Sequence, residues 1–149
     1  MGLDSYLLAK RPLDGSEDKN NATIVTAVFP ELSAVGVSAS RVEAELGYWR
    51  SNRALHRWFV ENVQGGRDEC QRSYVSREQL QELLAIVERV LANPELDSEL
   101  LPTGAGFFFG STEYDEYYIQ DLQETKKILD DVLNDPIFDG WDFYYQASW

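Results

Sequence analysis

The stretch RVEAELGYWRSNRALHRWFVENVQ, residues 41–64, contains a strand pattern followed at once by a helix pattern. Over residues 41–49 apolar and acidic side chains alternate, and a period of two predicts a strand with one exposed face. A Ser-Asn pair then offers a helix cap, and the apolar residues that follow recur at helical spacing until a Gly-Gly pair. We therefore predict a helix from about Ser51 to Gln64. The buried face of the preceding strand is predicted to carry Val42, Ala44, Leu46 and Tyr48.

Segments outside this stretch also have the composition of strands or helices. Strands are predicted where β-branched, aromatic or apolar residues form short runs that end at Pro, Gly or polar residues. Helices are predicted where apolar residues recur at helical spacing, most clearly after the capping box of Ser76 and Gln79. Residues 31–40 match neither pattern. The predicted strands cover residues 4–10, 23–29, 71–75, 107–109 and 140–149, and the predicted helices cover residues 77–92 and 114–134.

These elements predict the fold class. A chain of 149 residues has the length of one domain, residues 1–149. Three helices with five or six strands predict an α+β fold, in which a mostly antiparallel sheet carries the helices packed on one face.

The charge balance excludes several classes of function. The chain has 26 acidic residues against 13 Lys and Arg, and its formal net charge is -13. Direct binding to nucleic acid needs a basic surface that displaces counterions, and docking on an anionic membrane needs one as well. We therefore expect neither. No run approaches the roughly 20 apolar residues of a membrane span, and we expect a cytoplasmic protein.

The sequence offers little for catalysis or metal binding. Cys70 and His56 are the single cysteine and histidine, so an intrachain disulfide and the usual Cys/His zinc sites are excluded. Acids next to Cys70 disfavour a reactive thiolate. Two carboxylates can hydrolyse a glycosidic bond. With 26 acids in the chain, some pair will always have a suitable spacing, so such a pair is no evidence for a glycosidase. We expect a protein that is not an enzyme and that needs no cofactor and no metal.

The acidic residues gather toward the end of the chain. Residues 95–149 contain thirteen acids and two lysines, which gives 2 − 13 = −11. Helical spacing places several of these acids on one side of the helix predicted over residues 114–134. This face either solvates the protein, imitates a phosphate backbone for a partner with a basic groove, or binds a cation, although the calcium-loop spacing is absent. The candidate partner-binding residues are Glu113, Asp115, Glu116, Asp121, Glu124, Asp131 and Asp135, with Tyr114 and Tyr117 as aromatic anchors.

An arginine stripe gives an alternative site. Arg50, Arg53 and Arg57 have the spacing i, i+3, i+7 and are predicted to share one side of the helix after residue 50. Such arginines are either solvated, paired with acids, or bind a phosphate or carboxylate. The alternative function is therefore a module that binds an anion or a nucleotide, such as a sponge for a signalling molecule.

Several blocks of the sequence are similar to known proteins. MGLDSYL, GYWRSNRALHRWFVENV, VSREQLQELL, LLPTGAGFFFGSTEYDEYYIQDL and FYYQASW resemble a family of small acidic proteins encoded by bacteriophages and prophages. The family has no agreed biochemical activity, so the resemblance transfers no catalytic residue. It implies a protein of the host bacterial cytoplasm. By analogy with other small phage proteins, we expect an inhibitor of a host nucleic-acid-processing or defence complex, such as a CRISPR effector.

Overall fold

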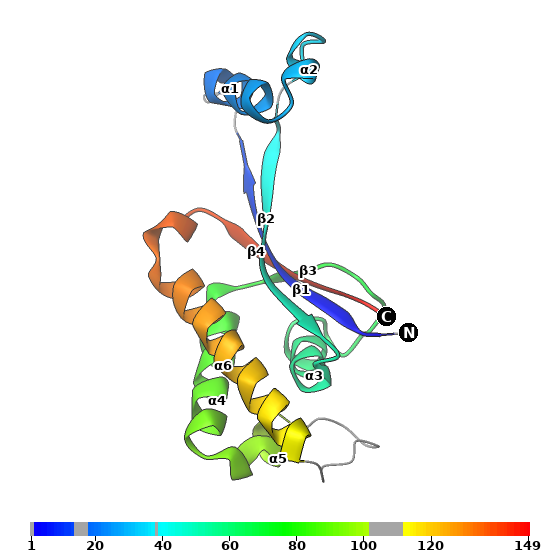
Figure 1. The fold of residues 1–149 in the computed structure, drawn as a ribbon, viewed down its shortest axis with the longest axis vertical. Helices are drawn as coiled ribbons and strands as arrows, with labels where there is room; N and C mark the ends of the chain where they lie inside the picture. The colour runs from blue at the N-terminus through cyan, green and yellow to red at the C-terminus, as the bar shows by residue number, and fades with distance from the viewer. Residues whose placement is uncertain (1, 14–17, 38, 102–111) are drawn as a thin grey trace.

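The computed structural model describes residues 2–13, 18–37, 39–101 and 112–149, and Figure 1 shows their arrangement. One antiparallel sheet contains four strands in the order β2-β1-β4-β3. The first and last strands of the chain therefore pair in the centre of the sheet, and the two termini lie close together (Figure 1). The strands are β1 (Asp4–Pro12), β2 (Arg41–Arg50), β3 (Ser73–Val75) and β4 (Asp142–Ser148).

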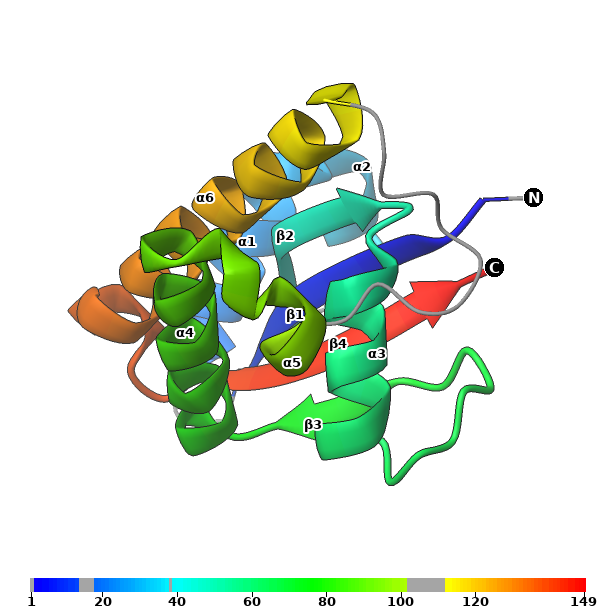
Figure 2. The same cartoon turned by 90° about the horizontal axis from the view of Figure 1, so that it is seen from below.

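Helices α3 (Arg53–Asn62), α4 (Arg77–Ala92) and α6 (Thr112–Asn134) lie on one side of the sheet, as Figure 2 shows. Each begins within two residues of its predicted start. The capping box predicted at Ser76 is present at the start of α4. Fully buried side chains from both layers form the core, among them Leu7, Phe59, Leu83, Leu129 and Phe143. Shorter turns of helix follow α4 and α6, namely η2 (Pro94–Leu96), α5 (Asp97–Leu100) and η3 (Pro136–Phe138).

A β-bulge in β2 decides which side chains of this strand face the helices. The register with β1 shifts at Leu46, which has no partner on the neighbouring strand. The extra residue moves the alternation by one position. Trp49 is therefore buried, whereas Tyr48 is exposed. The prediction that Tyr48 lies on the buried face is wrong, because a strict period of two allows for no bulge.

The bulge brings β2 into close contact with α6. The Trp49 indole Nε1 donates a hydrogen bond of 2.9 Å to Thr125 Oγ1, and both side chains are buried. At Gly47 an added Cβ would lie only 2.8 Å from the Trp49 ring and 3.3 Å from the Ile128 side chain. Glycine is therefore required at this position for α6 to pack against the strand.

The hairpin of β1 and β2 extends beyond the sheet and carries a small helical unit at its tip (Figure 1). We call this unit the knob and define it as residues 18–37, which include α1 (Asp18–Val28) and α2 (Pro30–Ser33). The strand predicted over residues 23–29 is wrong, since these residues form most of α1. A strand at the tip would have no neighbour to pair with, whereas a helix satisfies its backbone groups internally.

The fold class α+β is confirmed, and the finer count of elements is corrected. In the described residues the sheet has four strands, whereas five or six are predicted for the chain. The strand predicted at residues 107–109 lies outside the described residues. None of the helices in the described ranges combines the length and the apolar character that crossing a membrane requires.

Two neighbouring leucines of α4 test this packing. Leu83 is fully buried, whereas Leu84 packs against the edge of the core and keeps part of its surface in water. We expect Leu83→Ala to lower the free energy of unfolding by about 2–5 kcal/mol, because it leaves a cavity. Leu84→Ala should lower the free energy of unfolding by clearly less than Leu83→Ala does. Urea unfolding of both variants measures the difference, and an equal or larger loss for Leu84→Ala would contradict the orientation of α4.

Candidate functional site

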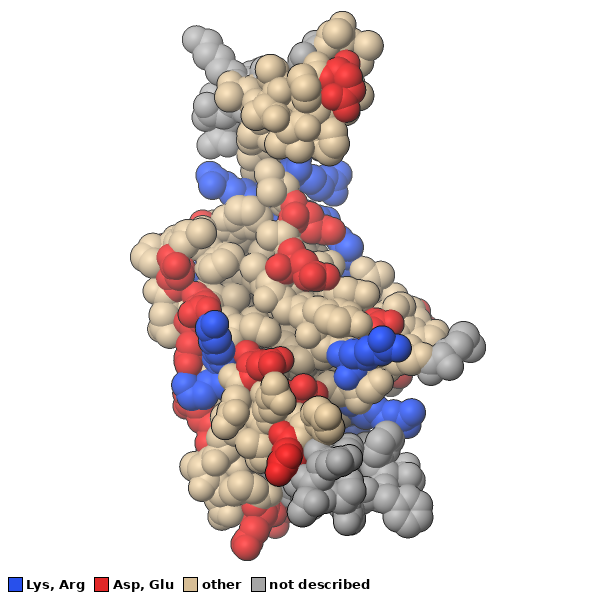
Figure 3. Space-filling view, viewed as in Figure 1, with Lys and Arg blue, Asp and Glu red and all other residues tan. Residues whose placement is uncertain are grey.

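The acidic face of α6 is the most distinctive charged surface in the described part of the chain. Glu116, Glu124 and Asp131 are exposed on one side of this helix, and the opposite side is buried against the core. Tyr117 lies beside them with 67% of its surface exposed. In Figure 3, acidic side chains line the edge of the body where α4 and α6 lie, with some basic side chains among them. Lys127, between Glu124 and Asp131 in the sequence, is also exposed. The structure therefore exposes four of the predicted partner-binding residues along α6.

Asp121 does not belong to this exposed face. It is half-buried, and its Oδ2 accepts a hydrogen bond of 3.3 Å from Asn52 Nδ2, the N-cap residue of α3. Burial raises the pKa of the Asp121 carboxyl, the nearby charge of Glu124 raises it further, and the bond from Asn52 opposes both. The prediction that Asp121 points outward with Glu124 and Asp131 is corrected, because this carboxylate joins α6 to α3.

The remaining predicted acids have separate positions. Asp135 follows the end of α6, and its side chain accepts a hydrogen bond of 3.0 Å from the Ile137 backbone N–H, which caps η3. The side chains of Glu113, Tyr114 and Asp115, in the first turn of α6, lie outside the part of the structure that is described. The acidic face that the structure supports is therefore Glu116, Tyr117, Glu124 and Asp131.

A shallow hollow lies at the C-terminal end of α6. It has a volume of about 450 Å3 and is lined by Asp130, Asp131, Asn134, Asp135 and Pro136. Its carboxylates do not converge on one point, and Asp130 pairs with Lys126. In the described ranges no group of three or more His, Cys, Asp or Glu side chains is arranged to hold a metal ion.

The arginine stripe is divided between two elements. Arg50 is the last residue of β2, whereas α3 begins at Arg53. The prediction that all three arginines lie on one helix is therefore wrong. Arg57 donates from its Nε to Glu61 Oε1 at 2.9 Å, an exposed pair one helical turn apart. Because the Arg57 Nε donor is already bonded to Glu61, it is not available to bind an anion.

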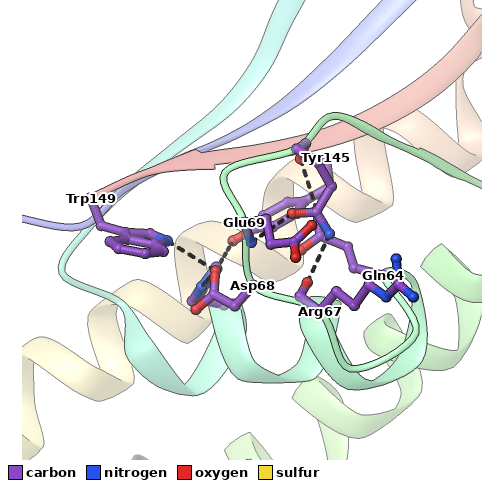
Figure 4. A network of polar contacts seen from close by, with 8 residues as sticks. Gln64, Arg67, Asp68, Glu69, Tyr145 and Trp149 are labelled. Carbon is purple, nitrogen blue, oxygen red and sulfur yellow. Dashed lines mark hydrogen bonds and ion pairs between the residues drawn. The ribbon is translucent and has the colours of Figure 1, made fainter.

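The lone histidine belongs to a polar network that the sequence did not predict. His56 Nδ1 lies 2.7 Å from the Tyr145 hydroxyl, and its Nε2 lies 3.0 Å from Asp68 Oδ1 without the alignment of a hydrogen bond. Trp149 Nε1 donates to the same Asp68 oxygen at 2.9 Å, and Figure 4 shows this contact. The network joins α3, the loop before β3 and the end of β4.

The chemistry available to this network is limited by burial. Tyr145 is fully buried, and its ring stacks on Phe59 with centroids 3.9 Å apart. Burial raises the pKa of the Tyr145 phenol far above its usual range, and this effect outweighs the hydrogen bond with Ser5. A phenol that keeps its proton and touches no solvent cannot exchange protons with a substrate. We interpret the network as structural.

The face of the sheet opposite the helices carries tyrosines. Tyr48 and Tyr74 are exposed, and Tyr6 and Tyr144 are half-buried beside them. The rings of Tyr6 and Tyr48 lie 5.3 Å apart, and those of Tyr74 and Tyr144 lie 6.0 Å apart. These rings were missed as a group because they come from four strands. The register of the strands, which no local pattern reveals, places them on one face.

The chain matches no family model, no curated protein and no solved structure.

The buried phenol predicts a loss of stability in alkali. The unfolded Tyr145 releases its proton near pH 10, whereas the folded phenol keeps it, so raising the pH above about 10 favours the unfolded state. In Tyr145→Phe this part of the alkaline loss should disappear. At pH 7 the variant should lose about 1–3 kcal/mol, because His56 Nδ1 loses its partner. Urea unfolding at several pH values measures both effects.

Tyr144→Phe is the matched control, since this neighbouring tyrosine is half-buried on the other face. It should show the same alkaline loss as the unsubstituted chain. An unchanged alkaline loss in Tyr145→Phe would contradict the role given to the buried phenol.

Proposed function

We propose that this chain is a non-enzymatic binding protein that occupies the basic nucleic-acid-binding groove of another protein with the acidic face of α6. The observation that carries the proposal is the outward position of Glu116, Glu124 and Asp131 on one helix of a chain with a net charge of -13. A basic groove that binds this face releases counterions much as it does on binding DNA.

The spacing of the three acids supports this comparison with nucleic acid. Glu116, Glu124 and Asp131 are eight and seven residues apart, which corresponds to about 12 and 10 Å along an α-helix. Successive phosphates of one DNA strand rise by about 3.4 Å along the duplex axis. The spacing between successive carboxylates of α6 is therefore about the spacing of every third phosphate. A groove that holds arginines or lysines against a phosphate backbone can meet such a row of charges.

Tyr117 gives the acidic face an anchor of a different kind. Its ring is two-thirds exposed and lies beside Glu116 near the start of the described part of α6. Tyrosine is common among the residues that dominate binding energy, because a rigid ring buries a large area at low entropic cost. The acids would then govern the rate of association, and the ring would slow dissociation.

The kind of partner follows from the resemblance to small phage proteins together with this surface. By analogy, small phage proteins of this kind often block host proteins, and the acidic face favours those that act on nucleic acids. The proposed partner is therefore a host nucleic-acid-processing or defence complex, such as a CRISPR effector, inhibited by occupation of its basic groove. The alternative module for anions or nucleotides has less support, since Arg50 lies on β2 and Arg57 pairs with Glu61.

Charge reversal on α6 tests the proposal. We expect Glu124→Lys with Asp131→Lys to fold normally, because exposed substitutions usually change stability by less than about 0.5 kcal/mol. The same variant should lose the partner. The measurement is capture from a nuclease-treated bacterial lysate on each immobilised protein, followed by elution with duplex DNA. Nucleic-acid-binding proteins should elute from the unsubstituted chain and not from the variant.

Glu78→Lys with Glu82→Lys is the matched control. Both residues are exposed on α4, and the change in net charge is the same. This control should still capture the partner. Equal losses in the two variants would show that only the total charge matters, and equal capture by all three proteins would remove the acidic face of α6 from the function.

A further inference from the structure

The knob exposes an apolar surface that the rest of the chain does not cover. Val35 is 70% exposed, Val28 61% and Phe29 52%. Ile24, Leu32 and Val37 are exposed beside them. Most of the visible surface of the knob in Figure 3 carries no charge. Large apolar patches of this kind mark interaction sites on soluble proteins.

The helices of the knob are short. Helix α1 has 11 residues and α2 has four, and the knob touches the rest of the molecule through the hairpin stalk (Figure 1). Helices of this length are marginal in water unless an apolar face is packed against a partner. Among the knob side chains that the structure describes, Val25 is the one buried hydrophobic residue, so α1 and α2 cover little of each other.

We propose that the knob is a self-association surface that pairs with the knob of a second copy of this chain, tip to tip about a two-fold axis. An apolar patch with few charges is complementary to itself and needs no matching charge on the partner. The sequence of the knob contains two acids and one lysine, Asp18, Glu31 and Lys19, so two knobs can meet with little repulsion. The remaining surface of a chain with a net charge of -13 repels its copy.

The stalk makes the tip the place where two copies can meet. Pairing of β1 with β4 ends at Lys10, so residues 11–13 of the hairpin project about 10 Å beyond the sheet. The distance over which salt screens charge is about 8 Å under physiological conditions. In a tip-to-tip pair the two stalks separate the acidic bodies by more than twice that distance. The pair should therefore depend little on salt.

The composition of the knob favours a second copy over a lipid surface. Helices that lie on membranes combine an apolar face with many lysines or arginines. The knob sequence contains one lysine, and the body would be repelled by anionic lipids. A standard protein interface contains roughly 20–30 residues on each side, whereas the knob offers six exposed apolar side chains. We expect a weak, reversible dimer.

Sedimentation equilibrium of the full chain, from low micromolar to several hundred micromolar, tests the proposal. The unsubstituted protein should form a dimer, and small-angle scattering should give that dimer close to twice the maximum dimension of the monomer. Phe29→Asp with Val35→Asp should raise the dissociation constant by about tenfold or more, because a charge would be buried in an apolar contact. Tyr74→Asp with Ile137→Asp, two exposed positions on the body, is the matched control and should leave the constant nearly unchanged.

Four results would overturn the proposal. They are a monomer at every concentration, a compact dimer, a dimer that survives the knob substitutions, and an equal effect of the control pair. A flotation assay with vesicles of phosphatidylglycerol and phosphatidylcholine tests the lipid alternative. If the protein binds these vesicles only when Phe29 and Val35 are present, and does not dimerise, the knob is a membrane-binding surface. The scattering experiment uses the unsubstituted chain, so its result stands even where a variant folds poorly.

Discussion

The position of α6 depends on the bulge at Leu46, because the bulge turns Trp49 into the core. From there the indole donates to Thr125, and Gly47 lets the helix approach the strand. A hydrogen bond between two buried side chains fixes the rotation of a helix more firmly than apolar contacts alone, since breaking it leaves both groups unpaired. With Thr125 turned inward, Glu124 and its neighbours one or two turns away face solvent. The acidic face is therefore a consequence of one extra residue in an adjacent strand.

The sequence predicted the elements whose periodicity is strong and local. Helices α3, α4 and α6 and strands β1, β2 and β4 were recognisable because each buries one face and caps or breakers mark its ends. The prediction failed at residues 23–29, where β-branched composition favoured a strand but no neighbouring strand exists at the tip of the hairpin. It also failed for Asp121. Helical spacing places this residue near the exposed side, and only a contact with Asn52, distant in sequence, draws it inward.

The charge of the chain is divided unevenly between the two sides of the sheet. On the side away from the helices, the strand register places four acids and four bases, and the pair of Arg72 and Glu43 reaches across the strands. The acidic excess is therefore carried elsewhere, mainly by the helices. The helices also contain bases, and Lys126 of α6 pairs with Glu88 and Asp130, which offsets part of the repulsion among the acids. The acids of this open face are Asp4, Glu43, Glu45 and Asp142, and its bases are Lys10, Arg41, Arg50 and Arg72.

The knob and the acidic face lie on different parts of the molecule, so one does not obstruct the other (Figure 1). A pair joined at the knobs, as proposed above, would present two acidic faces on bodies held apart by two stalks. Exposed charges contribute mainly to the rate of association, so in the proposed complex the three acids of one face would add little to its lifetime. Linking two such faces makes the second contact intramolecular, and the gain depends on whether the spacing of the partner's grooves matches the span of the pair. A stalk of two paired strands would set that span more narrowly than a flexible linker. Self-association at the tip would therefore favour partners that are themselves two-fold or that repeat a basic groove at a fixed distance.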